Sequence, residues 1–312
     1  MNPYPTPGAL EAAIVQRLRN TFGSAELGRR RSEVAYRRLV ARLAATAPDR
    51  WVIKGGYGLI LRLEPNRTSN DVDVVYVDAG GEHAVAIAAF EAACRADLGD
   101  FFTFAIVSIG DEEDGRTRTA TVVARLGAQE WSRFGVDIAF PRANVPAHPL
   151  VDPPRLTGLA VIDDIPRGVG LLAWEQQIAE KCCGLFERRG ETPSGRLRDL
   201  LDLAMIARQV SGLDGGALID ALGGEAARRP LLPDGLPAAA TVHPDQRRSW
   251  TAASRRATRS APISLDDAER IVRRFLDPVL AHDVAGKAWS AESAAWVAPG
   301  DGHNAPPSPV DS

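Results

Sequence analysis

The stretch WVIKGGYGLILRLEPNRTSNDVDVVYV, residues 51–77, decides the fold. It holds two short apolar runs separated by a glycine pair, a short helical pattern and a polar loop. Lys54 and Gly55-Gly56 follow the first run, as is typical of a strand that turns into a helix. The second run is β-branched on both faces, which predicts a strand in the centre of a sheet. Two aspartates begin that strand, and this placement of like charges needs an explanation.

The remaining chain changes character near its middle. Helices are expected over 9–20, 26–46, 82–98, 171–188, 196–210, 216–222 and 265–282, and strands over 101–109, 118–126 and 134–140. The pattern predicts an α+β protein with a mixed-sheet N-terminal core and an all-α C-terminal domain. The expected division is N-terminal helices in 1–48, the α/β core in 49–150, a linker in 151–170, the helical domain in 171–285 and a disordered tail in 286–312.

Composition indicates an ordinary globular protein. The 312 residues are 45 % hydrophobic and 25 % charged, and the net charge of −3 excludes a polycation. The three cysteines, an odd number with one adjacent pair, do not form a disulfide framework, which favours a reducing compartment. The sequence shows no secretory leader and no apolar run near the ~20 residues that span a bilayer. We therefore expect a cytoplasmic protein without a membrane partner.

Three aspartates are candidates for a metal site. Alternate residues of a strand share a face, so Asp71 and Asp73 project together with Cα atoms about 6–7 Å apart. Two such carboxylates suit Mg²⁺, although a solvated strand end would show the same pattern. Asp137 shares its strand face with the small residues Gly135 and Ala139, which leaves room for a ligand, but it is also compatible with a strand-edge acid. Together the three acids form the set that a two-metal phosphoryl-transfer site needs.

The glycine pair suggests a phosphate contact. Gly55-Gly56 lies between a strand and a helix, where the backbone approaches a phosphate closely, and Lys54 adds a positive charge. A plain turn explains the pair equally well. The stretch is neither a P-loop nor a dinucleotide fingerprint, because both glycine spacings are missing.

Two predicted helices carry charges where the apolar pattern disfavours them. Lys181 falls on or beside the buried stripe of the helix over 171–188. Either its stem follows the core with its head in water, or it points into a cavity that holds an anion. Asp202 lies within the apolar run of the next helix, three residues after Asp199. It forms a structural ion pair, or it faces Lys181 across two packed helices.

Five blocks of sequence resemble one known family. The blocks IKGGYGLILRL, RTSNDVDVV, VDIAF, EQQIAEKCCGL and RLRDLLDLAMI occur in that family's order between about residues 35 and 275. They are similar to the AbiEii/AbiGii-type, MenT-like nucleotidyltransferase toxins of the DNA-polymerase-β-like nucleotidyltransferase superfamily. The resemblance implies a nucleotidyltransferase core in the N-terminal half. It also implies that the chain is an enzyme.

The resemblance assigns roles to individual residues. It implies that Asp71, Asp73 and Asp137 bind metal and that Asp202, or its neighbour Asp199, is the acid of the last block. It also implies nucleotide contacts from Lys54, Gly55, Gly56, Arg67, Ser69 and Lys181. The catalytic set would then be Asp71, Asp73, Asp137, Lys181 and Asp202. Tyr57 follows the glycine pair here, whereas the superfamily often has Gly-Ser at that turn, so a serine contact to phosphate is not expected.

The resemblance also implies a function. It indicates a toxin with an antitoxin partner, which uses Mg²⁺ or Mn²⁺ and transfers a nucleotide from an NTP to RNA, most simply the 3′ end of tRNA. The alternatives are a small-molecule nucleotidyltransferase of the aminoglycoside-modifying kind, and an inactive relative that binds RNA or protein. Two groups of arginines are candidates for the RNA backbone, or else belong to solvated helix faces, namely Arg29, Arg30, Arg31, Arg37 and Arg38, and Arg188, Arg189, Arg196 and Arg198.

Overall fold

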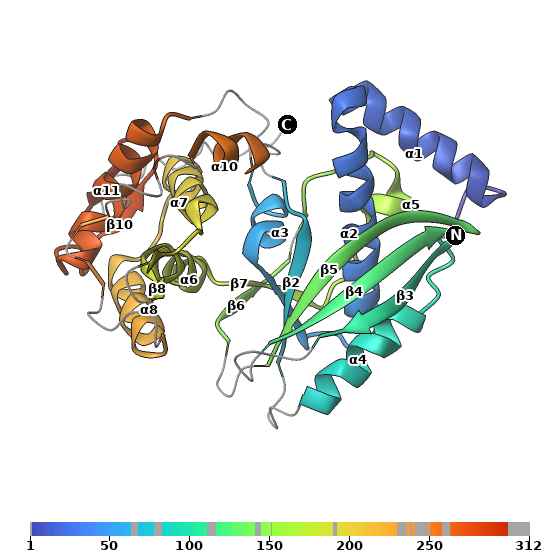
Figure 1. The fold of residues 1–312 in the computed structure, drawn as a ribbon, viewed down its shortest axis with the longest axis horizontal. Helices are drawn as coiled ribbons and strands as arrows, with labels where there is room; N and C mark the ends of the chain where they lie inside the picture. Colours follow the sequence, from blue (N-terminus) through green and yellow to red (C-terminus); the bar gives the residue numbers. More distant parts are fainter. Residues whose placement is uncertain are drawn as a thin grey trace, which may run out of the picture. The chain divides into compact units, whose positions relative to one another are not determined.

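The computed structural model divides into two compact units, Met1–Ala173 and Trp174–Ser312, and each is described by itself. It describes residues 2–63, 68–77, 83–110, 117–140, 145–150, 152–189, 192–229, 236–237, 239–240, 247, 250–257 and 263–298. Arg67 and the acidic turn predicted around 111–114 lie outside these residues. The α+β fold class predicted from the sequence is confirmed (Figure 1).

The first unit is built on a mixed seven-stranded sheet. Its order is β3-β4-β5-β2-β1-β7-β6, so the aspartate-bearing strand β2 is central, as predicted. β2 runs parallel to β5 and antiparallel to β1, while β3 and β4 pair in an antiparallel arrangement. The strands are β1 (Trp51–Lys54), β2 (Asp71–Tyr76), β3 (Phe102–Ile109), β4 (Thr117–Leu126), β5 (Gln129–Ala139), β6 (Ala147–Pro149) and β7 (Val169–Leu172).

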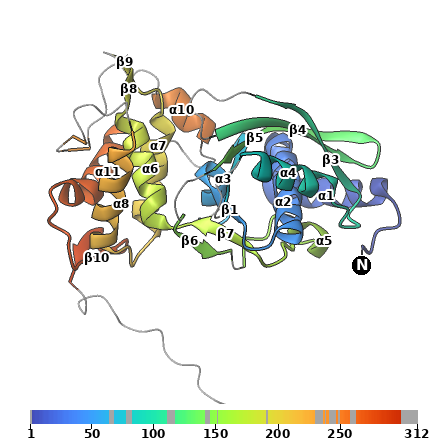
Figure 2. The same ribbon diagram turned by 90° about the horizontal axis from the view of Figure 1, so that it is seen from below.

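Two helices cover one face of this sheet. α2 contacts β5, α4 contacts β3, and the two helices contact each other (Figures 1 and 2). The residues beneath them, such as Val72, Val74 and Ile138, are completely buried. Because side chains alternate along a strand, the aspartates project from the opposite face. The helices of this unit are α1 (Pro7–Phe22), η1 (Ser24–Glu26), α2 (Leu27–Thr46), α3 (Gly55–Ile60), α4 (His83–Arg95) and α5 (Ala160–Asp163).

The pairing of β4 with β5 contains one irregularity. The two strands are joined by a tight turn at Gly127, whose φ of +60° is in the left-handed region that favours glycine. The register shifts between Ala124 and Arg125, and Trp131 is the extra residue on β5. Its indole Nε1 donates a hydrogen bond to the carbonyl of Arg31 on α2, 2.7 Å away, which anchors the irregularity to the helix.

The segment 151–170, predicted as an irregular linker, instead contributes to the first unit. It contains α5 and the first residues of β7, and β7 pairs in parallel with β1. Asp163 accepts hydrogen bonds from the backbone amides of Leu156, Thr157 and Gly158, which fixes the loop before α5. The helix predicted from residue 171 begins at Trp174, because Leu171 and Leu172 belong to β7.

The second unit is mainly helical. α6 packs against α7 and α8, and α11 packs against α7. Two short hairpins accompany these helices, a detail that the all-α expectation for this half lacked. The elements are α6 (Trp174–Phe186), β8 (Arg188–Arg189), β9 (Thr192–Pro193), α7 (Leu197–Gln209), α8 (Gly215–Ala227), α10 (Trp250–Ala257), α11 (Leu265–Leu280), β10 (Ala288–Ser290) and β11 (Ala295–Val297).

The disordered tail predicted over 286–312 is wrong for residues 288–297, which contain two strands, and residues 299–312 lie outside the described residues. β10 and β11 form an antiparallel hairpin, in which Trp289 is buried and pairs with Trp296. Both indoles contact the Phe275 ring of α11, at centroid distances of 4.9 and 5.6 Å. The prediction of a disordered tail rested on the composition of residues 298–312. Trp289 and Trp296, which precede them, bury enough apolar surface to order the hairpin. Among the described helices, none has both the length and the apolar composition needed to cross a membrane.

Candidate active site

Four side chains from four adjacent strands form one polar row across the sheet. Asp73 on β2 is the register partner of Lys54 on β1 and of Asp137 on β5. Asp137 is in turn the partner of Thr119 on β4. Register partners on neighbouring strands point to the same face and lie about 5 Å apart. We call Lys54, Asp73, Asp137 and Thr119 the polar row; at its centre, two carboxylates lie side by side.

Asp71 lies two residues before Asp73 on β2 and points to the same face of the sheet. We call the face with Asp71, Asp73 and Asp137 the acid face. Its register partner is Gly135, and the Ser69 hydroxyl donates a hydrogen bond to its Oδ1, 2.9 Å away. Ser69, predicted as a nucleotide contact, therefore orients Asp71 in this structure. A Cβ added at Gly135 would meet nothing within 4 Å, so there is open space beside Asp71 and Asp137. Burial raises the pKa of the Tyr36 phenol, and the negative charge of Asp71 raises it further.

The glycine turn makes room for Asp73. Gly55 has a φ of +60°, and a Cβ there would lie 1.8 Å from Asp73 Oδ2. No side chain fits this position, because the carboxylate and the Gly55 backbone approach each other closely. Gly56 is the second residue of the short helix α3, which starts at Gly55. The turn predicted as a phosphate contact thus also fixes the place of one of the acids.

The donor set of the acid face fits a divalent cation. Two carboxylates on a rigid strand, half-buried and aligned on one face, offer the hard oxygen ligands that Mg²⁺ prefers, and substrate phosphates and water complete its shell. The described residues contain no group of three or more His, Cys, Asp or Glu placed to hold a metal ion by themselves. The acids therefore fit a cation that the substrate also binds, rather than a closed protein cage.

The two charged residues of the helical unit form a buried cluster. Lys181 Nζ on α6 lies 2.6 Å from Asp202 Oδ2 and 3.1 Å from Asp199 Oδ1, both on α7. Asp202 is completely buried, and the other two are almost so. The prediction that Lys181 and Asp202 face each other across packed helices is met, and Asp199 also contributes. Neither a solvated lysine head nor an empty anion cavity describes this site, because two carboxylates surround the ammonium.

Neither interpretation of the α2 arginines, an RNA contact or a solvated helix face, is right for three of them. Arg30, Arg37 and Arg38 are each at most 5 % exposed. Arg37 donates to the carbonyls of Pro154 and Asp163, and Arg38 Nε bonds to Asp100 Oδ2 at 2.7 Å, so these side chains tie distant loops to α2. The candidates that remain on the surface are Arg29, Arg31, Arg188, Arg196 and Arg198, and the side chain of Arg189 lies outside the described residues.

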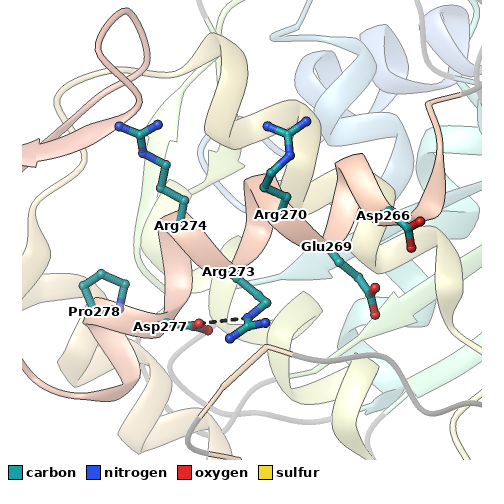
Figure 3. Close-up of a pocket in the computed structure, with 7 residues that line it drawn as sticks. All are labelled: Asp266, Glu269, Arg270, Arg273, Arg274, Asp277 and Pro278. Atoms are coloured by element: carbon teal, nitrogen blue, oxygen red, sulfur yellow. Dashed lines mark hydrogen bonds and ion pairs between the residues drawn. The ribbon is translucent and has the colours of Figure 1, made fainter.

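A hollow of about 500 Å³ lies along α11 on the surface of the second unit (Figure 3). Its lining holds three arginines and three carboxylates, and Arg273 Nε donates to Asp277 Oδ2 at 3.1 Å. None of the described residues that were predicted as functional lines this hollow. The lining consists of Asp266, Glu269, Arg270, Arg273, Arg274, Asp277 and Pro278. This hollow is therefore not where the chemistry is expected.

Sequence reasoning missed Thr119. The alternating Thr117-x-Thr119-x-Thr121 pattern places three hydroxyls on one strand face, and this signal was available. Which carboxylate they meet depends on the hairpin register, and the irregularity at Trp131 sets that register. Thr119 Oγ1 donates a hydrogen bond to Asp137 Oδ1 at 2.6 Å.

Comparisons with known proteins show the family of the chain. The family model described as the nucleotidyl transferase AbiEii toxin of type IV toxin–antitoxin systems matches residues 37–285. No curated protein matches the chain. MenT4, a nucleotidyltransferase toxin of Mycobacterium tuberculosis H37Rv, is similar in fold, with a TM-score of 0.57 and 20 % identity over 89 % of this chain and 90 % of that one. JHP933 of Helicobacter pylori has a TM-score of 0.45 and 15 % identity over 83 % of this chain and 95 % of its own. Since the family model covers most of its length, the chain belongs to the AbiEii family and is a nucleotidyltransferase toxin of a type IV toxin–antitoxin system.

Proposed function

We propose that this nucleotidyltransferase transfers NMP from an NTP to an RNA acceptor, most simply the 3′ end of tRNA, with Mg²⁺ or Mn²⁺ as the cofactor. Blocking that end stops aminoacylation and therefore translation, which accounts for toxicity. The reaction would take place in the cytoplasm, and a cognate antitoxin would restrain it. One observation carries the proposal: Asp73 and Asp137 are like charges in direct register, and open space lies beside them at Gly135.

The acid pair explains why a cation is needed. Adjacent carboxylates repel each other, and the flanking Lys54 and Thr119 supply only one positive charge to the polar row. A divalent cation bound with the triphosphate neutralises the acids and stabilises the charge that develops on the phosphoryl oxygens. Asp71 and Asp73 are the proposed ligands, and Asp137 completes the set.

The chain's own groups then position the reactants. The acceptor hydroxyl attacks the α-phosphorus of the NTP, the bond to the bridging oxygen breaks, and pyrophosphate leaves. In this proposal Asp137 accepts the proton of the attacking hydroxyl. Lys54 and the Gly55-Gly56 turn contact the phosphates in this proposal. Most of the rate comes from such positioning and charge neutralisation, because phosphoryl transfer requires little covalent chemistry from the protein.

Lys181 and Asp202 have a second role in the proposal. Lys181 contacts the nucleotide's phosphates, and Asp202 orients its ammonium group. The 2.6 Å contact between Lys181 and Asp202 supports this orienting role. Asp199 holds the ammonium from a second side. Arg67 and Ser69 complete the predicted nucleotide contacts.

Labelling with each of the four α-³²P NTPs tests the proposal. The full-length protein is incubated with total RNA or with a panel of aminoglycosides, with MgCl₂ or with EDTA. We expect label in RNA of tRNA size, lost with EDTA and with Asp73→Asn, and kept with Asp220→Asn, which changes an exposed acid on α8. Label found only on an aminoglycoside would replace the RNA acceptor with the small-molecule alternative.

Growth inhibition separates catalysis from binding. Expression of the wild type should arrest growth, and Asp71→Ala should relieve the arrest. If Asp71→Ala still arrested growth as strongly as the wild type at equal protein level, the chain would act as a binding protein rather than as an enzyme.

A further inference from the structure

Asp137 has a specific hydroxyl partner. Thr119 Oγ1 lies 2.6 Å from Asp137 Oδ1, at the length of a hydrogen bond from a hydroxyl to an ionised carboxylate. An ionised carboxylate only accepts hydrogen bonds, so the threonine is the donor. We propose that Thr119 is a positioning residue for nucleotidyl transfer, whose hydroxyl holds the Asp137 carboxylate in its working orientation. This inference rests on the proposed function.

The position of Asp137 explains why it needs such a partner. Its carboxylate lies in register with Asp73, and both are only half-buried. Rotation about χ2 of aspartate is broad, so repulsion from Asp73 would turn the Asp137 carboxylate away. A hydrogen bond to Oδ1 fixes that rotation and so places Oδ2 as well. Threonine suits this task because its branched Cβ restricts χ1.

The neighbouring threonines show that the contact is more than ordinary strand pairing. Thr117 and Thr121 occupy the same face of β4 as Thr119, but their register partners on β5 are Ala139 and Gly135, which have no polar side chain. The row of Thr117 continues to Val75 on β2 and to Val52 on β1 and is apolar beyond the threonine. Among the three threonines, Thr119 alone faces a carboxylate, and the chain thus offers Thr117 as a matched control.

Three variants of the full-length protein separate positioning from strand stability. Thr119→Val removes the hydroxyl at nearly constant shape, and Thr119→Ser keeps it. Thr117→Val makes the same isosteric change in the apolar row. Each is tested by Mn²⁺ binding without nucleotide, followed by electron paramagnetic resonance, by steady-state RNA labelling, and by the thermal unfolding midpoint.

We expect Thr119→Val to raise the Mn²⁺ concentration for half-saturation and to lower kcat, each by about tenfold or more, as is usual when the partner of a metal-ligating side chain is lost. The KM for the NTP should change less than twofold, because Asp137 acts on the attacking hydroxyl. Thr119→Ser should restore both values to near wild type, and Thr117→Val should leave both unchanged. The unfolding midpoints should stay together.

Two outcomes overturn the inference. One is that Thr119→Val labels RNA and binds Mn²⁺ like the wild type. The other is that Thr119→Ser fails as badly as Thr119→Val, which would make the methyl packing rather than the hydroxyl responsible. In both, the wild type still labels RNA, so the proposed function survives. If the wild type itself neither binds Mn²⁺ nor labels RNA, the proposed function fails and this inference with it.

Discussion

The two units handle buried charge in opposite ways. On the acid face of the sheet, Asp73 and Asp137 lie side by side, half-buried, beside open space at Gly135. In the helical unit, Lys181 sits between Asp199 and Asp202, and Arg196 lies 2.9 Å from Asp199, so two positive charges meet two negative ones. Among the described residues, the polar row holds two carboxylates and one lysine, whereas the helical cluster holds as many positive as negative charges. A row rich in carboxylates suits a cation, whereas a neutral buried cluster contributes to the stability of its unit.

The largest expected effect is on catalysis, and it comes from a change in the polar row. Asp73→Asn should lower nucleotidyl transfer on the order of a thousandfold, which corresponds to about 4 kcal/mol of transition-state stabilisation. It should not lower the thermal midpoint, because it removes a repulsion. The measurements are RNA labelling and thermal unfolding on the same preparation. If Asp73→Asn lost stability in proportion to activity, Asp73 would be a residue that stabilises the fold.

Changes in the cluster of Lys181, Asp199 and Asp202 should lower the free energy of unfolding. Asp202→Asn removes the completely buried carboxylate that lies 2.6 Å from Lys181 Nζ and should cost about 3 kcal/mol in the free energy of unfolding. Asp199→Asn should cost clearly less, because Arg196 is 56 % exposed and turns to solvent while Lys181 keeps Asp202. Urea unfolding measures both. Equal losses for the two variants would contradict the view that Asp202 is the essential counter-charge.

Two glycines of the first unit sharpen the same comparison. Gly55→Ala should lower stability by about 1–2 kcal/mol, because its φ is positive, and should also lower activity, because Asp73 must move. Gly135→Ala should be neutral or slightly stabilising, since its Cβ meets only open space. Unfolding midpoints and labelling rates give both comparisons. If Gly135→Ala were as unstable as Gly55→Ala, the acid face would have no open space at Gly135.

A third kind of buried charge in the first unit responds to pH. Glu33 pairs with Arg30 inside the first unit, yet desolvation by burial outweighs that pairing and raises its pKa from 4.5 to about 7. Its folded form therefore holds a proton between these values that the unfolded form has lost. Its contribution to stability should fall by about 1 kcal/mol per pH unit as the pH rises from 4.5 to 7 and level off above 7.

Comparing the wild type with Glu33→Gln by urea unfolding at pH 5, 6, 7 and 8 isolates this contribution. The stability difference between them should shift in favour of the variant as the pH rises to 7. The exposed Glu130→Gln should show no such trend. A flat difference for Glu33→Gln would mean that Arg30 outweighs desolvation.

The sequence was sufficient for features that depend on local periodicity. The shared face of Asp71 and Asp73 follows from the two-residue repeat of a strand, and the central place of β2 follows from its β-branched faces. The meeting of Lys181 with Asp202 was also predictable, because each charge interrupts an apolar helix stripe. In all these cases a local pattern already determines which way the side chain points.

Features that depend on distant partners were not predictable in this way. Arg37 and Arg38 resemble a solvated helix face, but backbone carbonyls and Asp100, at least 62 residues away, bury them. The register of Asp137 with Asp73 joins strands that are separated by a helix and a hairpin. Trp289 falls in a segment whose composition predicts disorder, and it packs against the Phe275 ring on α11, which is distant in the sequence.

The extra residue Trp131 makes the length of one hairpin as important as the residues within it. If Trp131 were instead paired with Ala124, the ladder from the turn at Gly127 would bring Thr119 opposite Val136, and Asp137 would lose the hydroxyl beside it. A relative that lacks this one residue would keep Thr119 opposite Asp137 in a regular ladder, but it would lose the indole hydrogen bond to α2. The number of residues between Gly127 and Asp137 and the presence of the irregularity are therefore linked, independent of residue identity.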